Sequence, residues 1–123
     1  MYQNNAYNAY QNNKFETASK GDLLLMLYDG AIKFLKFSII AMDDNDIENT
    51  NKNLIKVQDI LNELMSTLNF DAGKVAKNLY SLYEYMNHEL IQANIKKDKE
   101  KIKMVKEMME DLRNTWAKAM NKA

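Results

Sequence analysis

The sequence predicts an all-α protein, an antiparallel up-and-down four-helix bundle, and three observations support this fold class. The 123 residues include no proline and only three glycines. Both residue types end helices and form turns, so their scarcity favours long helices joined by short connections. Hydrophobic residues make up 46% of the chain, which is enough for one core in a single domain. Apolar side chains also recur every three or four residues over four stretches, as on one side of a helix.

Residues 1–18 differ in composition from the rest of the chain. The first 13 residues are rich in Asn, Gln and Tyr and carry no charged side chain. Such a segment buries too little apolar area to fold alone. Tyr7 and Tyr10 are three positions apart, on one side of a helical turn. We therefore assign residues 1–18 to a flexible or short-helical N-terminal cap segment, which is either a frayed terminus or docks onto the body.

The first predicted helix begins at Ser19 and ends near residue 42. Ser19 followed by Asp22 resembles a capping box, with Asp in place of the usual Glu. This stretch is apolar on more than one face, which predicts that it is central or partly covered by something else. Gly30 lies inside it and costs about 1 kcal/mol relative to alanine. A close helix crossing would explain a glycine there.

Three further amphipathic helices complete a bundle over residues 19–123. They are predicted at residues 46–68, at 73–95 and, after a polar break at 96–99, up to about residue 120. Short connections require neighbouring helices to be antiparallel. The stripe of the second helix consists of Leu54, Val57, Leu61, Leu64 and Leu68. The third and fourth stripes consist of Val75, Leu79, Leu82, Met86, Leu90 and Ala93, and of Ile102, Val105, Met109, Leu112, Trp116 and Ala119.

The charge balance and the cysteine count exclude several classes of function. Seventeen basic side chains balance seventeen acidic ones, and Arg113 is the only arginine, which argues against nucleic-acid binding. The absence of cysteine excludes disulfides and thiolate metal sites. The longest apolar run, residues 23–28, is too short to span a bilayer, and the first 22 residues do not resemble a secretory signal. We expect a cytoplasmic protein with no membrane insertion.

The sequence offers no catalytic or metal-binding constellation. His88 is the only histidine, and no Glu lies three residues before it, so the paired Glu-x-x-His motifs of di-metal bundles are absent. Three scattered glycines form no phosphate-binding loop. We predict no enzymatic activity, no cofactor and no metal, and we interpret His88 as a surface residue. A metal-dependent bundle enzyme is the alternative that the single histidine argues against.

Several large residues lie off the predicted stripes and suggest a binding surface. They are Ile55, Ile60, Tyr80, Tyr83, Tyr85, Met104 and Met108. Nine methionines in the chain is a high number, and methionine is common at surfaces that accept apolar partners. All of these residues except Tyr85, together with Tyr7 and Tyr10, are our candidate partner-binding residues. The alternative is that Met and Tyr simply fill an irregular core.

Three motifs resemble one known family. They lie at residues 17–19 continuing into 23–32 (TAS and LLLMLYDGAI), at 76–86 (AKNLYSLYEYM) and at 112–116 (LRNTW). In this order they resemble the flagellin-specific export chaperones of the FliS family, and the similarity extends over nearly the whole chain. The family commonly has proline after the Thr-Ala-Ser, where this chain has Lys20. Proline suits a first helical position without being required there.

The resemblance implies a partner and a location. Family members bind the C-terminal region of newly made flagellin in hydrophobic grooves in the cytosol, prevent premature polymerisation, and deliver it to the export gate component at the membrane. Their N-terminal segment covers part of the binding surface until the client displaces it. The alternative hypothesis is a self-associating helical adaptor bundle with no export role, which would use the same apolar surface to bind its own copy.

Overall fold

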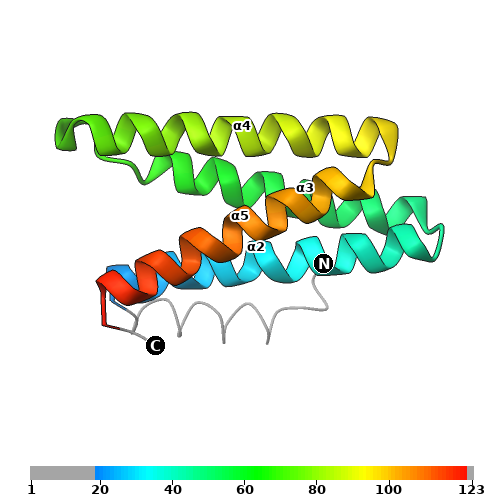
Figure 1. Ribbon diagram of the computed structural model, residues 1–123, viewed down its shortest axis with the longest axis horizontal. Coiled ribbons are helices and arrows are strands. Elements are labelled where there is room, and N and C mark those ends of the chain that lie inside the picture. The colour runs from blue at the N-terminus through cyan, green and yellow to red at the C-terminus, as the bar shows by residue number, and fades with distance from the viewer. Residues whose placement is uncertain (1–18, 122–123) are drawn as a thin grey trace, which may run out of the picture.

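A computed structural model of the protein describes residues 19–121, and over these residues it shows four α-helices in a bundle (Figure 1). In chain order the elements are α2 (Lys20–Asp43), α3 (Ile47–Ser66), a short 3₁₀ helix η2 (Phe70–Ala72), α4 (Lys74–Lys96) and α5 (Lys99–Ala119). Helix α2 packs against α3 and α5, and α4 packs against the same two helices. Consecutive helices run in opposite directions. The predicted all-α four-helix bundle is confirmed.

Local signals in the sequence set the helix ends. The Ser19 Oγ accepts a hydrogen bond from the Asp22 backbone N–H at 3.1 Å, and the Asp22 carboxylate accepts one from the Ser19 N–H at 3.4 Å. This is the predicted capping box, and it satisfies N–H groups that have no partner inside the helix. The Asp46 side chain caps α3 with one such bond, accepting from the Asn49 N–H at 3.1 Å, without the reciprocal bond of a capping box.

Two of the three connections are tight turns, which explains the antiparallel order. Between α2 and α3, Asn45 has a positive φ of 57°. Between α4 and α5, Lys97 has a φ of 52°, and Asp98 then caps α5. The connection from α3 to α4 is longer and contains η2 and Gly73, whose φ of 87° favours glycine.

The core lies along the inner faces of all four helices. The predicted stripe of α3 is confirmed at its four helical positions, Leu54, Val57, Leu61 and Leu64, all fully buried. Three predicted residues of α5, Ile102, Val105 and Met109, are also fully buried. From α2 the core takes Tyr28, Ala31 and Leu35, and from α4 it takes Tyr83, Met86, Leu90 and Ala93.

The predicted stripe of α4 was wrong at Val75, whereas Leu79 and Leu82 are partly buried and pack against the core. Val75 is 63% exposed, whereas Ala76 and Tyr83 are buried. The same kind of error occurs at the end of α5, where Ala117 is buried and Ala119 is exposed. In both helices the buried face is rotated by one position relative to the predicted stripe, and Tyr83 therefore lies in the core instead of off the stripe. The hydroxyl is tolerated inside because it has a hydrogen-bond partner there.

Gly30 does not mark a close approach of two helix backbones. A Cβ atom placed on Gly30 would meet one atom within 4 Å outside its own helix turn, the Ile60 Cδ1 at 3.4 Å. The neighbour is the end of a flexible side chain on α3, so the packing of α2 on α3 does not require glycine at this position.

Candidate functional site

An apolar groove lies at the end of the bundle where α2 and α4 begin and α3 and α5 end, on the left of Figure 1. Its volume is about 540 Å³. Helices α2, α4 and α5 and the connection after α3 contribute to it. The lining residues are Lys20, Leu23, Leu24, Leu27, Thr67, Leu68, Asn69, Val75, Ala76, Leu79, Tyr83 and Trp116.

The leucine-rich start of α2 forms one wall of this groove. Leu25 and Tyr28 point into the core and are buried, while Leu23, Leu24 and Leu27 are only partly buried and line the groove. A single helix cannot turn four leucines toward one core. The sequence therefore predicted correctly that this helix is apolar on more than one face, and the groove accounts for the second face.

Charge plays little part in the groove. Lys20 is the only charged residue among the described residues that line it. Leu68 and Leu79 are partly buried, and Val75 stands at the rim with most of its side chain exposed. The groove therefore offers apolar area and almost no ionic contact to an occupant.

Beneath the groove, three aromatic side chains form a polar network that joins α2, α4 and α5. The hydroxyl oxygens of Tyr28 and Tyr83 lie 2.5 Å apart. The Trp116 Nε1–H donates to the Tyr28 Oη at 3.1 Å. Tyr28 is fully buried and Tyr83 is 1% exposed. The network links α2 to α4, which face each other across the bundle.

Burial keeps both tyrosines of this network neutral. Removal from water raises the pKa of Tyr28 and that of Tyr83, because it disfavours the phenolate. The hydrogen bonds from Tyr83 and Trp116 oppose this for Tyr28 by stabilising its anion. At neutral pH both side chains therefore remain hydrogen-bond donors.

The predicted partner-binding residues do not come together at one site. Tyr83 lines the groove, but as a buried residue. Ile55 is 46% exposed on α3, Ile60 is partly buried near Gly30, and the Tyr80 ring packs on Phe70 with centroids 5.7 Å apart. None of these three borders the groove. Tyr7 and Tyr10 lie outside the described residues.

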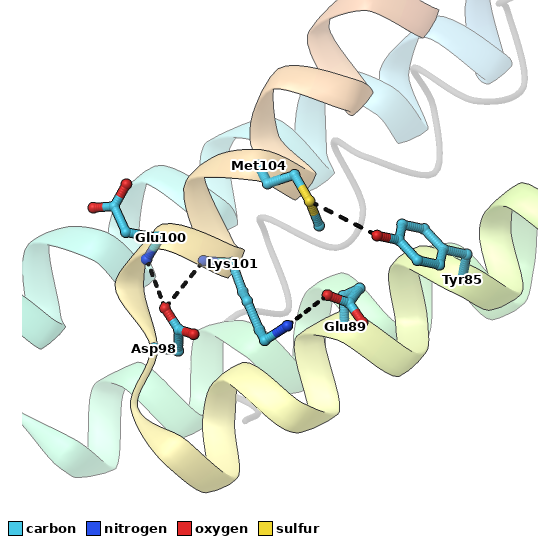
Figure 2. Close-up of polar contacts among 6 residues, drawn as sticks. All are labelled: Tyr85, Glu89, Asp98, Glu100, Lys101 and Met104. Atoms are coloured by element: carbon cyan, nitrogen blue, oxygen red, sulfur yellow. Dashed lines mark hydrogen bonds and ion pairs between the residues drawn. The ribbon is translucent and has the colours of Figure 1, made fainter.

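Met104 and Met108 belong to the contact between α5 and its neighbours. Figure 2 shows the Tyr85 hydroxyl donating to the Met104 sulfur at 3.9 Å, a weak contact. One turn away, the Lys101 Nζ donates to the Glu89 Oε1 at 2.8 Å, and this carboxylate raises the pKa of Lys101. Met108 is partly buried against the core. Both methionines therefore have packing roles within the bundle, and neither lines the groove.

Periodicity alone missed most of the groove residues. It placed Leu79 and Trp116 in the core, and it gave no role to Leu23, Leu24 or Leu27. The sequence signal for the groove is the high leucine content of residues 23–27, because one buried helix face cannot accommodate all of these leucines.

Neither metal ligation nor membrane crossing is supported within residues 19–121. No cluster of three or more His, Cys, Asp or Glu side chains in this part of the chain could hold a metal ion. His88 is exposed on α4, as predicted. Among the described helices, none combines the length and apolar character needed to span a bilayer.

Comparison with known proteins gives one consistent result. The chain matches the family described as "Flagellar protein FliS" over residues 3–123. It is 40% identical over 116 residues to the flagellar secretion chaperone FliS of Bacillus subtilis, covering 94% of this chain and 86% of the relative. The corresponding protein of Campylobacter jejuni is 31% identical over 122 residues, covering 98% and 95% of the two chains. That of Salmonella typhimurium is 30% identical over 129 residues, covering 100% and 96%.

The family is one of chaperones and not of enzymes, in agreement with the sequence prediction. The predicted resemblance is confirmed along nearly the whole chain, including the first turns of α2 that line the groove. This chain belongs to the FliS family of flagellar secretion chaperones.

Proposed function

We propose that this protein binds the C-terminal region of flagellin in the cytoplasm, prevents its premature polymerisation and delivers it to the flagellar export apparatus. One observation carries the proposal: a chain of the flagellar secretion chaperone family has an open apolar groove of about 540 Å³. Burial of apolar area contributes about 25 cal/mol per Å². An apolar segment that covers Leu24, Leu27 and Val75 would gain binding free energy from the apolar area buried at each of these residues.

The form of the groove favours a helical occupant. An amphipathic helix presents apolar residues at positions i, i+3, i+4 and i+7, and such a stripe fits a groove between helices. The helices that form the walls already pack on one another through the same kind of stripe. The client helix would then occupy a position like that of a fifth helix at this end of the bundle.

Shielding of such a stripe explains why a chaperone is needed. The family resemblance implies that the terminal regions of flagellin pair through apolar stripes in the filament. In the cytoplasm an uncovered stripe would associate with other copies, since apolar patches drive association. A chaperone that covers it holds the client as a monomer until an export gate component at the membrane receives the complex.

Residues 1–18 are proposed to regulate access to the groove. They are joined to Ser19, and the next residue, Lys20, lines the groove. A segment carrying Tyr7 and Tyr10 would compete with the client and lower its apparent affinity. Deletion of residues 1–13 should then tighten client binding or leave it unchanged. A large loss of affinity would contradict this regulatory role.

Calorimetric titration with the C-terminal segment of flagellin from the same cell tests the proposed function. We expect one-to-one binding in the micromolar range or tighter, with a negative heat-capacity change from apolar burial. No heat and no co-elution would contradict the proposal. Sedimentation of the mixture adds a second criterion, because a dimer that persists with client bound would favour the self-associating adaptor.

A further inference from the structure

One charged side chain interrupts the apolar lining of the groove. Lys20 is the first residue of α2, it is exposed, and it is the only charged residue among the described residues that line the groove. Two acids in neighbouring segments, Asp22 on α2 and Asp71 in η2, do not line it. An occupant of the groove therefore meets a single positive charge, at the start of α2.

The stability of the bundle does not account for a lysine at this position. The first turn of a helix carries partial positive charge from its N–H groups, so an anion there is favourable and a cation is unfavourable. Helices α3 and α5 follow this rule, with an aspartate as N-cap and a glutamate in the first turn. Helix α2 has Asp22 in its first turn but begins with a lysine.

Lys20 also has no partner within the described part of the chain. No hydrogen bond or ion pair joins its ammonium to another residue between 19 and 121. By contrast, the ammonium groups of Lys99 and Lys101 lie 2.6 Å and 2.8 Å from a carboxylate oxygen. The charge of Lys20 is therefore available to a segment bound in the groove.

We propose that Lys20 is a specificity-determining residue of the groove and pairs with an Asp or Glu at the edge of the apolar stripe of the client. This inference rests on the proposed function, because it concerns the same groove and the same client. It adds a requirement on the client sequence: one acidic residue must flank the apolar residues that enter the groove.

The acid lies at the edge of the stripe because of the way a lysine side chain is built. Its four-carbon chain can lie on apolar surface while its ammonium stays in water. A carboxylate that meets the ammonium there keeps part of its hydration, whereas one inside the groove would lose it. Pairs of this kind flank the apolar seams of packed helices, where they set partner choice and orientation.

The test is a calorimetric titration of the full chain and of its Lys20→Gln variant with the C-terminal flagellin segment. We expect the variant to bind about twofold to fivefold more weakly at low salt, the effect of one exposed ion pair. The difference should vanish at about 0.5 M salt, because exposed pairs are screened. Lys36→Gln is the matched control, since Lys36 is an exposed lysine of α2 outside the groove, and it should bind like the unmodified chain.

Lys20→Glu separates recognition from an effect on folding, because the two effects have opposite signs. A glutamate at the first helical position suits the helix dipole, so the denaturation midpoint should be at least as high as that of the unmodified chain. Client affinity should nevertheless fall further than in Lys20→Gln, since two like charges then meet at the rim. Equal affinity of both variants and the unmodified chain overturns the inference and leaves the proposed function intact. Failure of the unmodified chain to bind the segment contradicts the proposed function itself.

Glu16 provides a further control, because it is the only acid in residues 1–18. We expect Lys20→Gln to have the same effect on client affinity with and without Glu16→Gln. If the effect disappears in the Glu16→Gln chain, Lys20 acts on the N-terminal segment of its own chain and the inference is wrong.

A second series changes the client instead. Each Asp and Glu of the flagellin segment is replaced in turn by Asn or Gln, and a further version has its C-terminal carboxylate amidated. One side-chain replacement should weaken binding to the unmodified chain about twofold to fivefold and have little further effect on Lys20→Gln. Replacing the same acid by lysine should restore binding to Lys20→Glu. If no side-chain replacement weakens binding, or only the amidation does, the inference is overturned.

Discussion

The indole Nε1–H of Trp116 donates a hydrogen bond to the Tyr28 hydroxyl across 3.1 Å and so joins the end of α5 to the first half of α2. Trp116 lines the groove, whereas Tyr28 lies in the core. One wall of the groove is therefore held in place by a buried polar contact.

Tyr28→Phe should lower the free energy of unfolding by about 1–3 kcal/mol. The substitution removes the acceptor of the Trp116 N–H and a hydrogen-bond partner of Tyr83, and buried donors without partners are costly. Urea denaturation followed by circular dichroism measures the change. Tyr85→Phe, at a residue 46% exposed, should stay within about 0.5 kcal/mol of the unmodified chain. Equal stability of the two variants would mean that the network contributes nothing.

Val75→Gln should weaken binding of the C-terminal flagellin segment at least about fivefold, because it places an amide against the apolar face of the client. Val75 lines the groove and is 63% exposed, so the bundle itself should tolerate the change. Ile95→Gln is the matched control, since Ile95 lies on the same helix, is 71% exposed and is outside the groove. Calorimetry on both variants gives the comparison, and similar losses would show that the client binds elsewhere.

Gly30→Ala should raise the free energy of unfolding by about 0.5–1 kcal/mol. Alanine is the better helix former, and its Cβ would meet only the Ile60 Cδ1 at 3.4 Å. Gly21→Ala should raise the free energy of unfolding by less than Gly30→Ala. Its Cβ would lie 2.5 Å from the Met120 sulfur, so the Met120 side chain would have to move. Thermal unfolding of the two variants tests this order. A clear destabilisation by Gly30→Ala would mean that the Ile60 side chain cannot move to make room for the added methyl group.

Stability should fall as the pH rises above about 10, the ordinary tyrosine pKa. The pKa of Tyr28 and that of Tyr83 are both raised by burial in the folded chain, so the unfolded chain loses these protons first. The stabilisation that these two tyrosines contribute is complete below their pKa in the unfolded chain. It is lost as the pH rises from that value through their higher pKa in the folded chain. Lys99 and Lys101, whose pKa values carboxylates raise, act in the same direction. Denaturation midpoints between pH 8 and 11 should fall less steeply for Tyr83→Phe than for Tyr85→Phe.

The helices could be predicted from the sequence because local signals determine where they end. Ser19 and Asp22 form the capping box that the sequence predicts. The apolar spacing of α3 also predicted its buried face correctly. These features depend on residues three or four positions apart. No proline and few glycines interrupt the helices between them.

The groove could not be predicted because periodicity shows which side of a helix is apolar, and not whether another helix reaches that side. Val75 continues the apolar pattern of α4, yet no described helix covers it. Tyr83 lies one position from the predicted stripe of α4, and its partner Tyr28 is 55 positions away on another helix. Both errors concern contacts between elements distant in the sequence.

The position of Trp116 has a practical consequence for work on this protein. It is the only tryptophan in the chain and it lines the groove, with its indole N–H in a known hydrogen bond. Intrinsic fluorescence excited near the red edge of indole absorption therefore comes from a single site. Replacing water around that ring by apolar side chains would shift its emission to shorter wavelength, so the unlabelled chaperone carries its own optical probe of whether the groove is filled.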